Sequence, residues 1–201
     1  SITNHNFSVQ INNTNINRVY HTKFLGVIID SKLKWQNHIM HIKNKVSKTI
    51  GILLRARKTI CNKLLLTLYN TLILPHFTYC ISIWGKTYKK YTNHLTIIQK
   101  RIIRIIAHSP HLTHTAPLLE RFKFLTFEQL YTYHSLIFAH KLYNNTLPAI
   151  MNTTFNTTQP NHPYSLRNSS NIRQPFRNLT ISPFGLKYNI PINSGMICLP
   201  L

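Results

Sequence analysis

Acidic residues are nearly absent from this sequence: three Asp and Glu stand against 24 Lys and Arg in 201 residues, a formal net charge of +21. The three acids, Asp30, Glu120 and Glu128, are far apart, and no two aspartates are adjacent. Magnesium-dependent transfer of nucleotides requires paired carboxylates that hold the metal beside the reacting oxygen. We therefore expect no metal ligands and no catalytic residues of this kind in the chain.

Cysteine is also scarce, and the complete set is Cys61, Cys80 and Cys198. An odd number without C-x-x-C spacing argues against a disulfide framework and is typical of a reducing compartment. The first 17 residues are polar and rich in Asn, so we expect no signal peptide and a protein that is not secreted. The chain begins at Ser1 instead of Met, and we expect it to be part of a longer protein.

A histidine metal site is the next candidate that the sequence argues against. His108, His111 and His114 follow one another at a regular spacing. Pro110 interrupts any helix that would align the three rings, and no cysteine or carboxylate is near enough in sequence to complete a zinc site. We therefore expect these histidines to lie exposed in a loop and to bind no metal.

Charged residues are missing from residues 64–85, a run long enough to cross a bilayer. Polar residues such as Thr67 and Asn70 lie inside the run, however, and Pro75 interrupts it. Two buried helices that meet at Pro75 explain this stretch better than a membrane span, so we expect no membrane partner. A membrane protein anchored by Leu64–Trp84 is the less favoured alternative.

Positive charge is the most prominent feature that the sequence does have. A coding sequence rich in A and T would raise the lysine content but would not remove Asp and Glu, so we expect nucleic acid as the partner. The basic residues expected to contact phosphates lie on the polar faces of two predicted helices: Lys43, Lys45, Lys48, Arg55, Arg57, Lys58, Lys100, Arg101 and Arg104. Such contacts position a duplex without identifying its sequence.

Short strands are predicted near the N-terminus. Residues 7–11 and 16–20 alternate between apolar and polar side chains across an Asn-rich turn, and residues 23–29 form a third, β-branched strand that contains a glycine. Together they predict one small antiparallel sheet with poorly covered edges. Asp30 or Ser31 can then accept the free amides of the helix that follows.

Helices with one apolar face are predicted after the sheet. The first covers residues 31–58, with its apolar face at Trp35, Ile39, Ile42, Val46, Ile50 and Leu53. The second begins with Asn62 as its cap and carries Leu64, Leu65, Leu68, Tyr69, Leu72 and Ile73 on its buried face. Pro75 ends the second helix, and a further helical stretch begins there.

The second half of the chain adds two more helices. One covers residues 94–108, with Leu95, Ile98, Ile102, Ile105 and Ile106 on its inner face. The other begins at Thr126 with Gln129 in the capping-box position and buries Leu130, Tyr133 and Ile137. The fold class is therefore mainly α, with a small N-terminal antiparallel β-sheet, a helical bundle and an extended C-terminal tail over residues 151–201.

One set of motifs resembles the region after the catalytic palm in LINE-type, jockey-like non-LTR retrotransposon reverse transcriptases: Phe24-Leu25-Gly26-Val27, Ile29-Asp30, Leu33-x-Trp35-x-x-His38-Ile39, Leu68-Tyr69-Asn70, Leu74-Pro75, Tyr79 and Trp84-Gly85. The resemblance is strongest over residues 22–106. It continues to Tyr164-x-Leu166-Arg167-Asn168 and to a closing Leu199-Pro200, where the family often has Trp-Asn in place of Ile197-Cys198.

The resemblance implies a role for each segment. Residues 1–30 would be the edge of the palm sheet with the primer-grip hairpin, residues 31–109 the helical thumb, residues 110–150 a post-thumb helical segment, and residues 151–201 an extended, partly disordered basic tail. The primer grip would be Phe24, Leu25 and Gly26, which would support the primer end of a hybrid between an RNA template and a DNA primer.

Catalysis would then come from the upstream palm and fingers of the same polyprotein, whose carboxylates hold Mg²⁺, so we expect no cofactor in this chain. A ribonucleoprotein of this kind would occur in the nucleus and the cytoplasm. The alternative class is a stand-alone basic nucleic-acid-binding module or a domesticated relic without an enzymatic role.

Overall fold

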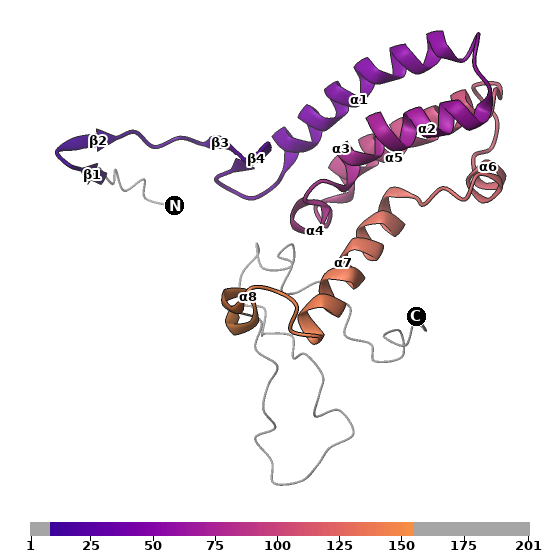
Figure 1. The fold of residues 1–201 in the computed structure, drawn as a ribbon. Coiled ribbons are helices and arrows are strands. Elements are labelled where there is room, and N and C mark those ends of the chain that lie inside the picture. The colour runs from indigo at the N-terminus through magenta and orange to yellow at the C-terminus, as the bar shows by residue number, and fades with distance from the viewer. Residues whose placement is uncertain (1–8, 155–201) are drawn as a thin grey trace, which may run out of the picture.

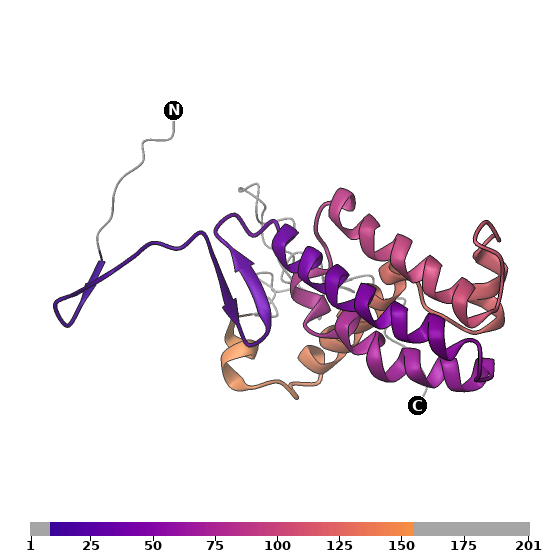
Figure 2. The same ribbon diagram turned by 90° about the horizontal axis from the view of Figure 1, so that it is seen from above.

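The structure is a computed structural model that describes residues 9–154. Its N-terminal part consists of two separate two-stranded sheets. Strand β1 (Val9–Ile11) pairs antiparallel with β2 (Thr14–Ile16), and β3 (His21–Phe24) pairs antiparallel with β4 (Val27–Asp30). The expectation of a single sheet is wrong, since β1 and β2 form a hairpin of their own that projects away from the helices (Figure 2).

The single strand predicted over residues 23–29 is instead a hairpin. Leu25 and Gly26 have positive φ angles of 45° and 86°, as in the two-residue turns that reverse a chain between antiparallel strands. Phe24 pairs with Val27 across this turn. Residues on both sides of the turn are apolar, so hydrophobic pattern alone did not reveal the reversal. A hairpin at this position agrees with the family resemblance.

The rest of the described chain is helical, which confirms the mainly α fold class with β structure near the N-terminus (Figure 1). The helices are α1 (Gln36–Ala56), α2 (Asn62–Leu72), α3 (Leu74–Thr78), α4 (Ile81–Trp84), α5 (Lys89–Ile106), α6 (Ala116–Arg121), α7 (Phe127–Tyr143) and α8 (Ala149–Thr154). Of the predicted N-terminal segment, residues 1–8 lie outside the described residues. Residues 155–201 of the predicted tail, with its motifs, do so as well.

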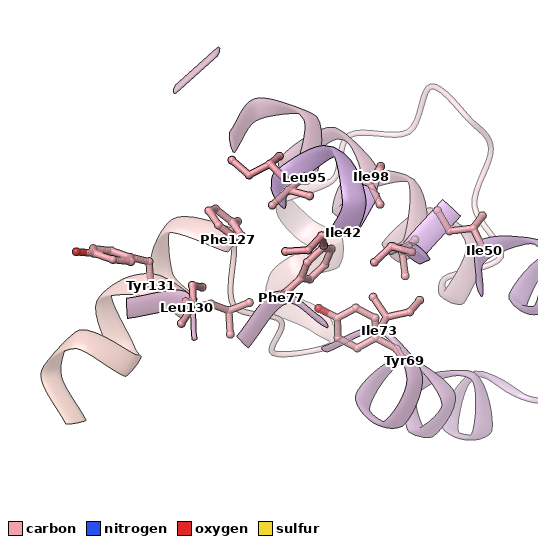
Figure 3. Packing of buried hydrophobic residues seen from close by; sticks show 14 of the residues in the cluster. Ile42, Ile50, Tyr69, Ile73, Phe77, Leu95, Ile98, Phe127, Leu130 and Tyr131 are labelled. Carbon is pink, nitrogen blue, oxygen red and sulfur yellow. The ribbon is translucent and has the colours of Figure 1, made fainter. Parts of the chain in front are cut away.

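One hydrophobic core lies among α1, α2, α3, α4, α5 and α7 (Figure 3). The predicted inner faces of α1 and α5 are all buried in it, because four- and three-residue spacings place apolar side chains on one side of a helix. Phe127, Leu130 and Tyr131 of α7 belong to the same core, which therefore crosses the boundary expected at residue 109. Tyr133 was predicted to be buried, but 52% of its surface is exposed.

The uncharged run over residues 64–85 is divided among three helices. As predicted, Pro75 lies in the first turn of α3. Backbone amides in the first turn of a helix have no partner within the helix, so a proline there removes no hydrogen bond. Cys80, with a φ angle of 52°, separates α3 from α4. Within residues 9–154, no helix has both the length and the apolarity that a bilayer crossing requires. Leu65, Tyr69 and Ile73 are buried as predicted, whereas Leu64 and Leu72 are exposed.

Helices α2 and α5 begin at other residues than predicted, because polar residues form their first turns. Asn62 is the first residue of α2 instead of its cap, and the preceding Cys61 makes no capping hydrogen bond with its side chain. Helix α5 begins at Lys89, earlier than predicted, and its Tyr91 packs against the core. Helix α6 lies within residues 110–150, where the resemblance implies a helical segment but where the sequence pattern predicted no helix before Thr126. The capping box of Thr126 is confirmed: its hydroxyl accepts from the Gln129 amide at 3.3 Å.

A buried glutamine fixes the beginning of α7 against α5. The side chain of Gln99 donates from Nε2 to the Leu125 carbonyl oxygen at 2.7 Å, and its Oε1 accepts from the Phe127 amide at 3.0 Å. Both polar ends of a fully buried side chain are thereby satisfied, which avoids the cost of about 1–3 kcal/mol for a buried group without a partner. The sequence prediction had assigned Gln99 no role.

Two glycines provide a matched test of this packing. A Cβ atom on Gly85 would lie 2.6 Å from the Ile81 carbonyl oxygen and 2.7 Å from Tyr131 Cδ2, whereas one on Gly51 would meet no atom within 4 Å. We predict that Gly85→Ala lowers the free energy of unfolding by about 1–3 kcal/mol because the added methyl group overpacks the core. Gly51→Ala in the same helical fold should raise it by about 0.5–1 kcal/mol.

Denaturant unfolding of the two variants beside the parent chain measures both changes. Equal midpoints for Gly85→Ala and the parent would contradict the close packing of Gly85 under Tyr131.

Candidate nucleic-acid interface

The β3–β4 hairpin presents its tip to solvent at one end of the helical core. Phe24 and Leu25 are exposed at this tip, and 74% of the Leu25 surface is accessible. The Tyr79 hydroxyl, from the end of α3, donates to the Leu25 carbonyl oxygen at 2.6 Å. The Tyr79 ring also lies against Gly26, since a Cβ atom there would be 3.7 Å from Tyr79 Cε1. The predicted primer-grip residues are therefore exposed on a turn that the helices hold in place.

Asp30 organises the loop between the hairpin and α1. Its carboxylate accepts from the backbone amides of Lys32 at 3.1 Å, Lys34 at 3.0 Å and Trp35 at 2.7 Å. These amides precede α1, so the expectation that Asp30 caps the helix is wrong: it stabilises the loop in front of it. Trp35 has a positive φ angle of 62°, an unfavourable conformation for a residue with a side chain, and the carboxylate bond helps to maintain it.

His38 links the second strand of the hairpin to the core. Its Nδ1 accepts from the Ile28 amide at 3.3 Å, and its ring lies edge-on to Trp84 with centroids 5.1 Å apart. An acceptor at Nδ1 requires a neutral ring with its hydrogen on Nε2. Burial lowers the pKa of His38 to about 4, and the positive charges of His41 and Lys45 contribute in the same direction. The hairpin is thus anchored by a histidine that stays uncharged at neutral pH.

Four basic side chains from β3, α1 and α3 interact electrostatically at this hairpin, and we call Lys23, His41, Lys45 and His76 the hairpin-side cluster. Burial, followed by the charges of Lys45, Lys23 and His76, lowers the pKa of His41. Burial, followed by the charge of Lys45, lowers the pKa of His76. Every charged group that acts on these two rings is a cation. The cluster is therefore a positively charged surface that a nearby anion would stabilise.

The predicted basic residues of α1 do not share one surface. Lys43 lines a small groove of about 70 Å³ between α1 and α5, together with Lys90, Tyr91 and His94. Lys45 belongs instead to the hairpin-side cluster, because residues two apart lie on nearly opposite sides of a helix. The structure thus divides the predicted interface of α1 into two flanks.

Other predicted phosphate contacts are partly occupied by hydrogen bonds. Arg104 Nε donates to the Thr113 carbonyl oxygen at 2.8 Å, and Arg57 Nε donates to His108 Nδ1 at 3.4 Å. Arg55 Nε donates to the Gly51 carbonyl oxygen at 3.4 Å within α1. Exposed side chains are found at Lys48, Lys58, Lys100 and Arg101. Of the nine predicted residues, the structure brings Lys45 alone into the cluster beside the hairpin.

The sequence prediction missed Lys23 and His76 as members of one surface with Lys45. They come from β3 and α3, and no spacing along the chain connects them. The signal that could have pointed to His76 is its position directly after Pro75, at the beginning of a helix. Over residues 9–154, no three His, Cys, Asp or Glu side chains come close enough together to hold a metal ion.

Two curated proteins are similar to part of the chain. It is 30% identical over 89 residues to the probable RNA-directed DNA polymerase from transposon X-element of Drosophila melanogaster, a match that covers 42% of this chain and 10% of that protein. It is 26% identical over 105 residues to the RNA-directed DNA polymerase from mobile element jockey of Drosophila funebris, which covers 51% of this chain and 12% of that protein. No family model and no solved structure matches the chain.

About half of the chain is therefore related to retrotransposon RNA-directed DNA polymerases, in agreement with the expected resemblance to reverse transcriptases. The matched regions span 10% and 12% of the length of these two relatives.

The hydrogen bond at the hairpin tip leads to a prediction about local opening. Tyr79→Phe should accelerate amide hydrogen exchange in β3 and β4 several-fold, while global stability changes by about 1 kcal/mol or less, because the Leu25 carbonyl can bind water instead. Hydrogen exchange followed by mass spectrometry measures this. Tyr133→Phe, which removes an exposed hydroxyl from α7, is the matched control. Equal exchange in the two variants would contradict the anchoring role of Tyr79.

The lowered pKa of His38 leads to a prediction about stability and pH. An unfolded chain takes up a proton at His38 below pH 6.5, whereas the folded chain does so only near pH 4, so stability should fall between these values as pH decreases. The loss from His38 is at most about 3 kcal/mol. His38→Gln keeps an acceptor for the Ile28 amide and should flatten this dependence. His111→Gln, at an exposed loop position, should retain the dependence of the parent chain in denaturant unfolding.

Proposed function

We propose that this chain grips the RNA–DNA hybrid of template and primer for a retrotransposon reverse transcriptase, through contacts to the nucleic-acid backbone. The observation that carries the proposal is the hairpin-side cluster: basic side chains of β3, α1 and α3 act on one another electrostatically, and β3 ends at the exposed tip formed by Phe24, Leu25 and Gly26. The relation to RNA-directed DNA polymerases supports the choice of partner. In this proposal the hairpin is the primer grip, and α1 with α5 and the helices between them form the thumb.

Phosphate contacts explain why the charge is so one-sided. Each phosphate that a Lys or Arg neutralises releases condensed counterions, so binding through such contacts is strong at low salt and independent of sequence. The histidines of the cluster would act in the same way, because a phosphate beside His41 and His76 raises their pKa values and favours their charged forms. Binding of the hybrid would therefore take up protons and strengthen as the pH falls toward 6.

We further propose that the chain contributes no catalytic carboxylates. Both oxygens of Asp30 already accept backbone amides, while Glu120 and Glu128 lie on α6 and α7. These residues do not fit a two-metal site, which needs carboxylates that converge on Mg²⁺. In the complete enzyme the metal would be held by other residues of the polyprotein, and this chain would supply affinity and position alone.

A charge-matched pair of variants tests the grip. Lys23→Gln with Lys45→Gln removes two charges from the hairpin-side cluster, and Lys123→Gln with Lys141→Gln removes two exposed charges from the region of α6 and α7. The first pair should reduce the slope of log affinity against log salt by about 2 for a short RNA–DNA hybrid, because two phosphate contacts are lost. The second pair should leave the slope unchanged.

Fluorescence anisotropy over a series of salt concentrations measures both slopes. If both pairs reduce the slope equally, the hybrid responds to net charge alone, and the proposed interface is wrong.

A further inference from the structure

A cavity lies on a different part of the molecule from the hairpin-side cluster. It has a volume of about 380 Å³ and forms where the end of α4, the beginning of α5 and the first half of α7 meet. Its lining includes Lys86, Lys89, Tyr131 and Ser135. A neighbouring cleft of about 590 Å³ shares Lys89 with it and extends along α5 and α7 to Lys100. None of these lining residues belongs to the hairpin-side cluster.

Two residues that line this cavity, Tyr131 and Ser135, carry buried hydroxyl groups without hydrogen-bond partners. Ser135 is 1% exposed and Tyr131 is 8% exposed, and within the described residues neither Ser135 Oγ nor the Tyr131 hydroxyl makes a hydrogen bond. Burial raises the pKa of Tyr131, and the adjacent Ser135 hydroxyl offsets part of this rise. The two hydroxyl groups are not placed at hydrogen-bonding geometry with each other. A buried hydroxyl without a partner costs about 1–3 kcal/mol. Such groups in native proteins commonly serve a ligand or an ordered water.

The charges around the cavity favour an anion. Lys86 Nζ lies 6.0 Å from the centre of the Tyr131 ring, and Lys89 is the first residue of α5. The N-terminus of an 18-residue helix carries partial positive charge on its free amides, so cations in its first turn are unfavourable unless an anion is near. Glu128 on the rim is the one carboxylate of the lining and balances only part of this charge.

We propose that the cavity between α4, α5 and α7 is a phosphate-binding site, in which Lys86 and Lys89 neutralise the phosphate and the hydroxyls of Ser135 and Tyr131 donate to its oxygens. The aromatic rings in the lining, Phe127 and Tyr131, are buried, so they offer little exposed face for a base to stack on, and the site recognises the phosphate group itself. That phosphate belongs either to a nucleic-acid strand or to a free nucleotide or phosphate ion.

Titration of the full chain with inorganic phosphate, and separately with a short single-stranded RNA, tests the site by two-dimensional amide NMR. Saturable shifts are expected at the amides of Lys86, Lys89 and Ser135. Ser135→Ala should weaken phosphate binding about tenfold, the loss expected for one hydrogen bond to a charged group. It should not destabilise the fold, because it removes a hydroxyl that has no partner. Lys86→Gln should also weaken binding, whereas Lys141→Gln on the last turn of α7 should not.

The outcomes separate the two sources and the two proposals. Saturation by phosphate alone assigns the site to a free ion or nucleotide, and saturation by RNA that phosphate displaces assigns it to a strand. The Lys23→Gln and Lys45→Gln pair should weaken hybrid binding and lower its salt slope while leaving the phosphate shifts intact, so failure of the grip does not affect this test. Absence of saturation with both probes overturns the inference. An unchanged affinity in Ser135→Ala does so too, since a structural water would then account for the hydroxyl.

Discussion

The structure around the hairpin depends on side chains that bind the backbone where it is conformationally unfavourable. Leu25, Leu33 and Trp35 have φ angles of 45°, 49° and 62°, and each such residue costs about 1–2 kcal/mol. The Tyr79 hydroxyl donates to the Leu25 carbonyl oxygen. The Asp30 carbonyl oxygen accepts from the Leu33 amide, and its carboxylate accepts from the Trp35 amide. Together with His38 on the Ile28 amide and Thr87 on the Lys34 carbonyl, these bonds tie an exposed turn to a rigid core. An exposed tip mounted in this way can contact a partner without losing much entropy on binding.

One-sided charge is the second constraint. With three acids in the sequence, the cations cannot all be paired, and the fold distributes them over separate surfaces: Lys43 lies in the α1–α5 groove, Lys45 in the hairpin-side cluster, and Lys86 with Lys89 near the beginning of α5. Separation lowers their mutual repulsion, which weakens with distance. It also means that the chain offers several anion-attracting surfaces instead of the single continuous one that helical spacing suggested. A duplex that follows α1 would meet either the groove or the hairpin-side cluster, and the exposed tip favours the latter.

Much of the helical core was predictable from local pattern. Every predicted apolar residue of α1 and α5 is buried, because in a helix the side on which a residue lies follows directly from its spacing. The capping box at Thr126 and the proline at the beginning of α3 were predictable for a similar reason, since both are interactions within one turn. The strand predicted over residues 23–29 was wrong because its turn lies between residues with the same apolar character. Polar residues that join a helix, such as Lys89, and polar side chains that are buried by a partner, such as Gln99, carry no local signal.

The sequence by itself determined the fold class, the inner faces of the long helices, the positive charge and the relation to retrotransposon polymerases, since each depends on composition or on residues close together in the chain. Only the tertiary structure decided which cations share a surface. Lys23, Lys45 and His76 come together because α3 and β4, the strand that pairs with β3, both pack against α1. Ser135 and Lys86 line one cavity because α7 packs against α4. Distance in space governs electrostatic interaction, and the folded chain makes neighbours of residues that its linear order keeps apart.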